Sequence, residues 1–349
     1  MKMKKGEFYR FLSCAIIIFF VIIYNISQPL NVEIVSIKKE KRKEDFSFFY
    51  TPEKETEKEQ VKTEEKPAEK EMTTEEKAAK VAAMGAVKGK ILSQYISPYN
   101  APLSYSSVYM KNNTGLPIDI KKYLNETLKL KLSQTDEPQV LIYHTHTTET
   151  FMAIDSDVYG ENFSSRTTDN SKNMVKIGDI VAQKLNSAGI KTLHDVTQHD
   201  YPSYTGSYTR SAATIKSYLQ KYPEIKVILD LHRDAVSSGQ SDKVKLVTEI
   251  NGKKAAQIML VMGSQSGTVK NHPNWEENFK LAIRIQQTIE KKYPTLARPL
   301  SLVSSNYNQS LSTGALLIEF GTDANSLQEV KYSAELVGDS IAETLKNLK

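Results

Sequence analysis

The chain has 349 residues, of which 40% are hydrophobic, 25% charged and 9% aromatic, and these ordinary globular proportions exclude a fibrous or fully disordered protein. Lys and Arg outnumber Asp and Glu by 46 to 41, and this net charge of +5 is too small to indicate nucleic-acid binding. The single cysteine, Cys14, excludes an internal disulfide and a cysteine-rich zinc site.

An apolar segment near the N-terminus predicts a membrane anchor. Residues 11–30 carry no charged side chain, and about 20 predominantly apolar residues suffice to cross a bilayer as a helix. Three lysines and an arginine precede this segment, which predicts a cytoplasmic N-terminus and places the rest of the chain outside the cell. A cleaved signal peptide is the alternative, but no small-x-small cleavage site follows the apolar run. We therefore expect residues 1–30 to form a basic tip and an uncleaved single-pass anchor.

A charged segment follows the predicted anchor. Residues 51–80 hold ten acids and seven bases, and so few apolar side chains cannot offset the entropy lost on ordering. The composition predicts a disordered linker over residues 31–90 and a single extracytoplasmic domain over residues 91–349.

The domain alternates predicted strands and helices. Continuous apolar runs at residues 139–143, 225–231 and 316–320 are typical of strands that are buried on both faces. Apolar residues three and four apart predict helices at residues 174–188, 209–221, 275–289 and 327–348, and Asn251-Gly252 predicts a hairpin turn. This pattern indicates an α/β fold with a mostly parallel central sheet and helices on both faces.

Ionisable side chains gather at the ends of the three apolar strands. Ligands bind at the carboxyl ends of the strands in an open α/β sheet, so we expect these side chains to meet at one edge. A glutamate inside the run LLIEF is especially informative, because a buried carboxylate needs a partner or a cation. The residues concerned are His144, His146, Glu149, His232, Arg233 and Glu319.

Two histidines and a carboxylate are the usual ligands of a catalytic zinc ion that keeps its fourth position for water. A second glutamate could then accept the proton of that water. Each histidine can instead be an ordinary loop residue with a satisfied hydrogen bond. His194 and His199 lie in a polar, turn-rich segment, and we interpret them as surface groups or as groups that contact the metal ligands without binding the metal. His272 is interpreted as an ordinary loop residue.

Three segments in this order, VLIYHTHTTETF, VILDLHRDA and ALLIEFGTDAN, resemble the stage II sporulation protein P family. The resemblance covers about residues 100–349, and the segment Ser106–Gly115 agrees with it. It implies a membrane-anchored peptidoglycan hydrolase of endospore-forming bacteria, located in the mother-cell membrane at the sporulation septum. It further implies action during forespore engulfment together with stage II sporulation proteins D and M.

The same core is similar to the zinc-dependent N-acetylmuramoyl-L-alanine amidases. That resemblance implies zinc as cofactor, with His146, Glu149 and His232 as ligands and Glu319 as the catalytic residue. The implied reaction is hydrolysis of the amide between N-acetylmuramic acid and L-alanine, and the family is also credited with endopeptidase activity on peptide cross-links.

This chain departs from the amidase pattern at three points. Threonines flank His146 where the amidases have a glycine-rich turn, and His144 is an additional histidine that rivals His146 as a ligand. The amidases' ligand glutamate usually lies nearer the first helix, where this chain has no acid at residues 171–173, so Glu149 is the ligand by default. Because residues two apart on an extended segment point the same way, both histidines could bind the metal.

Two arginines are candidates for substrate binding. Arg233 directly follows a predicted ligand and could hold a substrate carboxylate or the developing oxyanion, and Arg210 is a weaker candidate for the same task. Arg233 can instead be a surface or helix-capping group. Two other functions stay open: a zinc endopeptidase or carboxypeptidase without amidase activity, and a non-catalytic scaffold that binds the cell wall.

Overall fold

Short apolar runs and amphipathic segments alternate along the chain, and they form strands and helices in the computed structural model, which describes residues 72–133, 135–239 and 241–348. Residues Glu69–Lys349 form one compact unit. The expected anchor and most of the expected linker lie outside the described residues. Within the described ranges, none of the helices is both long and apolar enough to span a bilayer.

The helices are α2 (Thr74–Ala83), α3 (Ile120–Asn125), α4 (Met174–Ser187), α5 (Ser207–Lys221), α6 (Trp275–Lys292) and α7 (Leu327–Lys346), with short 3-10 turns at Pro98–Asn100 and Gln309–Leu311. The strands are β1 (Val87–Gln94), β2 (Leu103–Tyr105), β3 (Val108–Asn112), β4 (Val140–Tyr143), β5 (Val158–Gly160), β6 (Thr192–His194), β7 (Val227–Asp234), β8 (Ser237–Ser238), β9 (Asp242–Ile250), β10 (Lys253–Ala256), β11 (Ile258–Gly263), β12 (Leu300–Val303) and β13 (Ala315–Thr322). The domain boundary expected after residue 90 therefore falls inside β1.

The predicted helices are confirmed, and α4 shows why they form. The Asn173 side chain accepts a hydrogen bond from the Val175 amide at the start of the helix. Met174, Ile177, Val181 and Leu185 then follow at helical spacing and are fully buried. The helix ends at Ser187 with Ala188 as its C-cap, and Gly189 follows with φ of 79°, a value that favours glycine.

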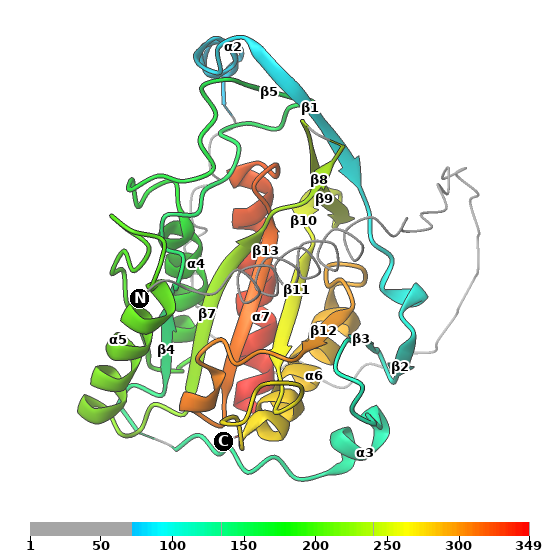
Figure 1. Ribbon diagram of the computed structural model, residues 1–349, viewed down its shortest axis with the longest axis vertical. Helices are drawn as coiled ribbons and strands as arrows, with labels where there is room; N and C mark the ends of the chain where they lie inside the picture. Colours follow the sequence, from blue (N-terminus) through cyan, green and yellow to red (C-terminus); the bar gives the residue numbers. More distant parts are fainter. Residues whose placement is uncertain (1–71, 134, 240, 349) are drawn as a thin grey trace, which may run out of the picture. The chain divides into compact units, whose positions relative to one another are not determined.

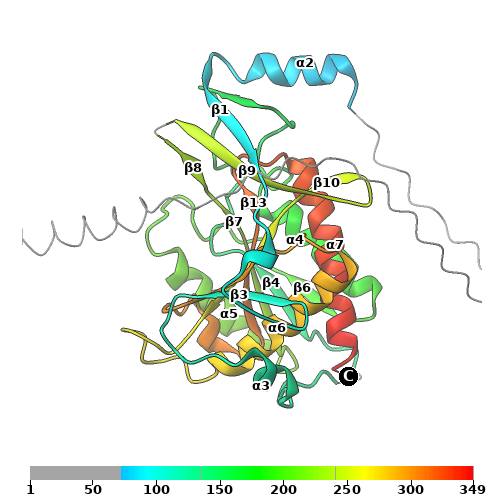
Figure 2. The ribbon, with the colours of Figure 1, turned by 90° about the vertical axis from the view of Figure 1, so that its right-hand side faces the viewer.

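The central sheet has eight strands in the order β2-β3-β12-β11-β13-β7-β4-β6. Helices α4, α6 and α7 cover one face, and α5 covers the other face over β4 and β7, as Figures 1 and 2 show. The prediction of helices on both faces is therefore confirmed. A second sheet joins β10, β9, β1 and β5, with β8 paired to β9.

The expectation of a mostly parallel sheet is corrected, because both sheets are mixed. In the central sheet β11 runs antiparallel to β13, and β2 runs antiparallel to β3. The chain enters β11 from the predicted hairpin, in which Asn251 and Gly252 both have positive φ between β9 and β10. It then passes from β10 to β11 through Gln257 alone, without the crossover helix that a parallel connection requires.

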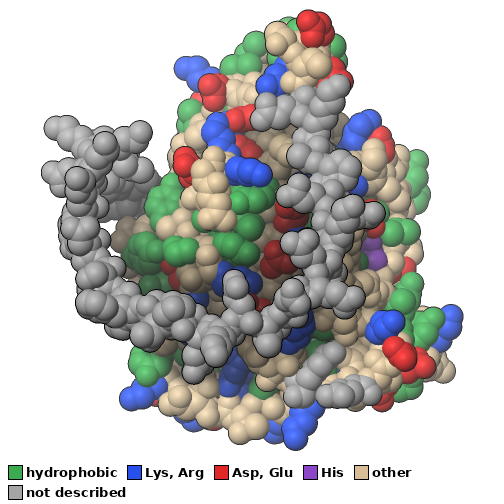
Figure 3. Space-filling model, turned by 180° about the vertical axis from the view of Figure 1, so that it is seen from behind, with side chains coloured by type: hydrophobic (Ala, Val, Ile, Leu, Met, Phe, Trp, Pro, Cys, Tyr) green, Lys and Arg blue, Asp and Glu red, His purple; other side chains and the backbone are tan. Residues whose placement is uncertain are grey.

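Charged side chains of both signs cover the back of the molecule. Figure 3 shows Lys and Arg interspersed with Asp and Glu and separated by apolar areas, wherever grey atoms do not cover this face. The visible part of the face therefore does not present a broad field of one sign.

Candidate functional site

Strand alternation places three acidic or imidazole side chains of β7 and β13 on one face of the central sheet. Leu229 and Leu231 belong to the core beneath α4, α6 and α7, so Asp230 and His232 point to the opposite face, which α5 covers. Glu319 of β13 is the register partner of His232, so their side chains lie next to each other on that face. Two of the predicted site residues are therefore neighbours across a pair of parallel strands.

His146 joins this group from the turn that follows β4. Its ring lies perpendicular to that of His232 with centroids 5.2 Å apart, and it stacks on Tyr204 with centroids 4.5 Å apart. The Nδ1 atom is inaccessible to solvent and has no hydrogen-bond partner among the described residues. Burial, together with the positive charges of His232 and Arg166, lowers the pKa of His146 to about 4. The ring is therefore neutral at pH 7, as a metal ligand must be.

Glu149 lies beside the two histidines and is buried. Its Oε2 accepts a hydrogen bond of 3.2 Å from the Arg233 amide and lies 3.7 Å from His232 Nδ1. Its Oε1 lies 3.6 Å from Arg166 Nη2. Burial raises the pKa of Glu149 against the opposing effect of His232 and the two arginines. Loss of contact with water thus outweighs the nearby positive charges.

His232 lies between two carboxylates. Its Nε2 is 2.8 Å from Asp230 Oδ1, although this contact does not meet hydrogen-bond geometry, and its Nδ1 faces Glu149. Burial disfavours the charged ring, but the carboxylates of Asp230, Glu149 and Glu319 overcome it and raise the pKa of His232 to about 10. Without a metal ion the ring therefore carries protons on both nitrogens and is positively charged at neutral pH.

Glu319, beside His232, has an unpaired carboxylate oxygen. The residue as a whole is partly accessible, but its Oε2 atom is inaccessible and has no hydrogen-bond partner among the described residues. Burial, and then the negative charges of Asp234 and Glu149, raise the pKa of Glu319 to about 8 against the effect of His232. A carboxyl group with a pKa near neutrality is suited to accept and donate a proton.

His144 lies on the other face of the sheet, away from this group. Its Nδ1 is 2.9 Å from the Leu231 carbonyl oxygen, and its Nε2 is 2.9 Å from His194 Nε2. Residues 145–148 form a turn, so the chain does not stay extended and His144 and His146 point to different places. His194 in turn contacts Asp179 of α4, at 3.0 Å. The structure therefore brings together His146, Glu149, His232 and Glu319, but not His144.

His199, Arg233 and Arg210 hold loops around the site. His199 Nδ1 is 2.8 Å from the His144 carbonyl oxygen. The Arg233 guanidinium donates from all three nitrogens to the carbonyl oxygens of Thr150, Asp234 and Ser165. The Arg210 guanidinium donates likewise to the carbonyl oxygens of His199, Thr205 and Ser203.

Sequence reasoning missed two polar residues of the site. Asp230 is fully buried and accepts hydrogen bonds from the amide and hydroxyl of Thr145, so it ties β7 to the turn that carries His146. Its signal was available, because an aspartate inside the run VILDL is as anomalous as the glutamate inside LLIEF. Arg166, which lies near Glu149, stands in a polar loop without such a signal.

The four side chains suit a metal ion by their chemistry but not by their spacing. Two imidazoles and two carboxylates suit zinc, and the unpaired His146 Nδ1 and Glu319 Oε2 are the kind of buried atoms that a metal and its water would satisfy. As placed, however, no three His, Cys, Asp or Glu side chains in the part of the chain that the structure describes lie close enough together to hold one.

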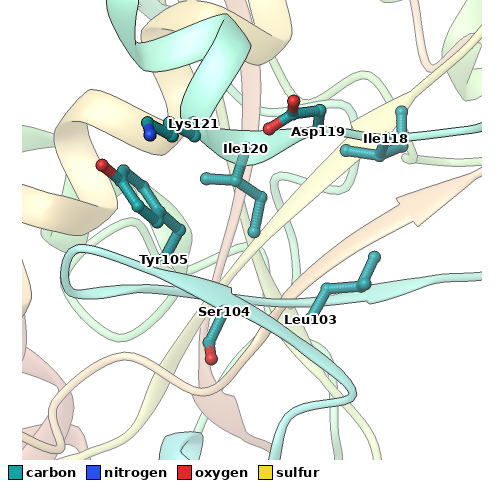
Figure 4. Close-up of a pocket in the computed structure, with 7 residues that line it drawn as sticks. All are labelled: Leu103, Ser104, Tyr105, Ile118, Asp119, Ile120 and Lys121. Atoms are coloured by element: carbon teal, nitrogen blue, oxygen red, sulfur yellow. The ribbon is translucent and has the colours of Figure 1, made fainter.

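A cavity of about 370 Å³ lies away from these residues, between β2 and the start of α3 (Figure 4). The Asp119 carboxylate at its edge is already engaged by the Lys122 amide of α3. The cavity contains no histidine or glutamate and is not a candidate for the chemistry above. Its lining residues are Leu103, Ser104, Tyr105, Ile118, Asp119, Ile120 and Lys121.

Several solved amidase structures share a weak likeness with this chain. The apo N-acetylmuramyl-L-alanine amidase Ami1 from Mycobacterium abscessus is 11% identical, with a TM-score of 0.36 over 60% of this chain and 98% of that one. The CwlD amidase from Clostridioides difficile, solved in complex with the GerS lipoprotein, is 10% identical, with a TM-score of 0.38 over 60% and 98%. Similarity this low supports no conclusion about activity.

The sequence comparisons are more specific. The stage II sporulation protein P of Bacillus subtilis (strain 168) is 31% identical over 226 residues, which cover 61% of this chain and 52% of that protein. The chain thus matches about half the length of this curated relative. The family model for stage II sporulation protein P matches residues 18–342, which is most of the chain. The protein therefore belongs to the stage II sporulation protein P family, as its three sequence segments predicted.

Proposed function

We propose that this protein is a zinc-dependent peptidoglycan hydrolase that cleaves the amide between N-acetylmuramic acid and the L-alanine of the stem peptide. The observation that carries the proposal is the convergence of His146, Glu149, His232 and Glu319 at one edge of the sheet, where three of their buried polar atoms have no hydrogen-bond partner among the described residues. Family membership supports a role in sporulation, and the amidase-like donor set supports the reaction.

His146, Glu149 and His232 would hold the metal. Zinc, when bound, supplies an acidified water and polarises the scissile carbonyl. Asp230 lies 2.8 Å from His232 Nε2 and would leave Nδ1, on the Glu149 side, as the coordinating atom. The proton that His232 carries in the metal-free protein must leave before this nitrogen can bind.

Glu319 would act as the general base and acid. A cation beside it favours its ionised form and so lowers its raised pKa towards the value that a base requires. The carboxylate accepts a proton from the attacking water and returns it to the leaving amine nitrogen as the amide bond breaks. The same groups could hydrolyse a peptide cross-link, because the electrophile is also an amide carbonyl.

The proposed function includes a location in the membrane and two partner proteins. The apolar residues 11–30 would anchor the protein in the mother-cell membrane at the septum, with the domain outside. Stage II sporulation proteins D and M would act beside it during engulfment, as the family resemblance implies.

Two variants and one product analysis test the proposal. Glu319→Gln should keep the fold and bind zinc but lose hydrolysis, and His232→Ala should lose zinc. Mass spectrometry of digested cell wall should show free stem peptides; severed cross-links on intact muropeptides would indicate an endopeptidase instead. Full hydrolysis by Glu319→Gln, or unchanged zinc content in His232→Ala, would refute the assigned roles.

A further inference from the structure

Arg166 differs from the other two arginines near the site because two of its guanidinium nitrogens, Nε and Nη2, donate no hydrogen bond to a described residue. Arg233 and Arg210 each donate from all three guanidinium nitrogens to backbone carbonyl oxygens. Arg166 donates only from Nη1, to Asp200 and to the Thr148 hydroxyl, and no described residue accepts a hydrogen bond from its Nε or Nη2. Its side chain is 35% exposed, so solvent reaches the guanidinium.

The backbone fixes Arg166 beside the predicted ligands. Residue 166 forms an antiparallel bridge with Glu149, and the Thr150 amide donates to the Ser165 carbonyl oxygen. The guanidinium carbon lies 4.8 Å from the centroid of the Tyr204 ring, which itself stacks on His146. Only the Tyr204 ring therefore separates the Arg166 guanidinium from His146, the proposed zinc ligand.

We propose that Arg166 binds a carboxylate of the stem peptide close to the scissile amide. This inference rests on the proposed function, because it assumes a peptidoglycan substrate. The Nε and Nη2 atoms of Arg166 donate no hydrogen bond to a described residue, although Nη2 lies 3.6 Å from Glu149 Oε1. This edge of the planar guanidinium matches a carboxylate, which can accept two hydrogen bonds from it. The pairing of Nη1 with Asp200 holds the fork in place before substrate arrives, which reduces the entropy lost on binding.

Tyr204 contributes the second surface of this subsite. Tyr204 is 57% exposed, although its ring stacks on the buried His146. Arg210 holds the loop that carries Tyr204 through the carbonyl oxygens of Ser203 and Thr205. An exposed aromatic ring on a fixed loop offers contact area to a ligand at low entropic cost. The subsite thus combines one cation with one aromatic surface.

The experiment compares two muramyl tripeptides that differ only in whether the α-carboxyl group of the second residue is free or amidated. Affinities are measured by calorimetry on the full-length chain in detergent micelles, with Glu319→Gln as the parent so that turnover does not consume the ligand. We expect the parent to prefer the free carboxyl group by about tenfold. Adding Arg166→Gln should reduce the preference to within about twofold of unity, and adding Arg166→Lys should restore part of it.

Lys172→Gln is the matched control. Lys172 is exposed and pairs with Asp169, and its substitution removes the same positive charge from the neighbouring loop. It should leave the preference unchanged. A parent without preference, or equal losses for both tripeptides in Arg166→Gln, would overturn the proposal and assign Arg166 a purely structural role. Turnover by the unsubstituted protein tests the proposed function separately, so the two failures are distinguishable.

Discussion

Glu319 should destabilise the metal-free protein at neutral pH, and its replacement by glutamine should stabilise it. The pKa of this carboxyl group is about 8 in the folded protein, against an ordinary value of 4.5. Between these two pH values the unfolded chain ionises Glu319 while the folded chain keeps it protonated. The unfolded state therefore binds fewer protons, and stability falls as the pH rises through this window.

The expected size follows from the same two values. A pKa of about 8 rather than 4.5 corresponds to about 3 kcal/mol at pH 7, and almost nothing below pH 4.5. Because Glu319 is partly accessible, relaxation reduces this figure, and we expect Glu319→Gln to gain about 1–3 kcal/mol at pH 7. A residue that weakens the fold in this way is typical of a functional position.

Urea unfolding in the presence of a chelator measures this effect at pH 5, 6, 7 and 8. The difference in the free energy of unfolding between Glu319→Gln and the unsubstituted chain should grow with each step. Glu335→Gln, at an exposed glutamate of α7, is the control and should follow the unsubstituted chain throughout. A difference that stays constant with pH, or a glutamine variant that is less stable at pH 8, would refute the reasoning.

Three further predictions concern the histidines. In Gly178→Ala the added Cβ would lie 2.3 Å from His194 Nε2 and 2.7 Å from His144 Nε2, so urea unfolding should show a loss of stability of about 1–3 kcal/mol. The same loss in a background in which both histidines are replaced by alanine would contradict the steric cause. Asp230→Asn should weaken zinc binding about 10–100-fold in chelator competition, because it alters the group that orients His232; unchanged affinity would count against that role. Zinc affinity should rise about tenfold per pH unit between pH 6 and 8, because binding displaces the proton from His232, whose pKa is about 10, and a flat profile in equilibrium dialysis would exclude this competition.

Local sequence determined the predicted helices, the hairpin turn and the candidacy of Glu319. The helical spacing of apolar residues in α4 and the Asn251-Gly252 turn each depend on neighbours only a few residues away. Glu319 could be singled out for the same reason, since a charged side chain inside an apolar strand needs no knowledge of the partner to be anomalous. The resemblance of three segments to a known family added the membership that the comparisons confirm.

Tertiary structure alone decided how these parts meet. Gln257 joins β10 to β11, and its buried side chain bonds to the backbone of Ile96 and Thr295 from distant segments. His144 packs against α4, Arg210 donates to loop carbonyl oxygens, and Arg166 lies beside Glu149. Each of these placements likewise depends on contacts between segments that are separate in the sequence. Short-range sequence patterns do not identify such partners. The hydrogen bonds of a side chain, and the charges around it, are set only when distant strands and loops pack together.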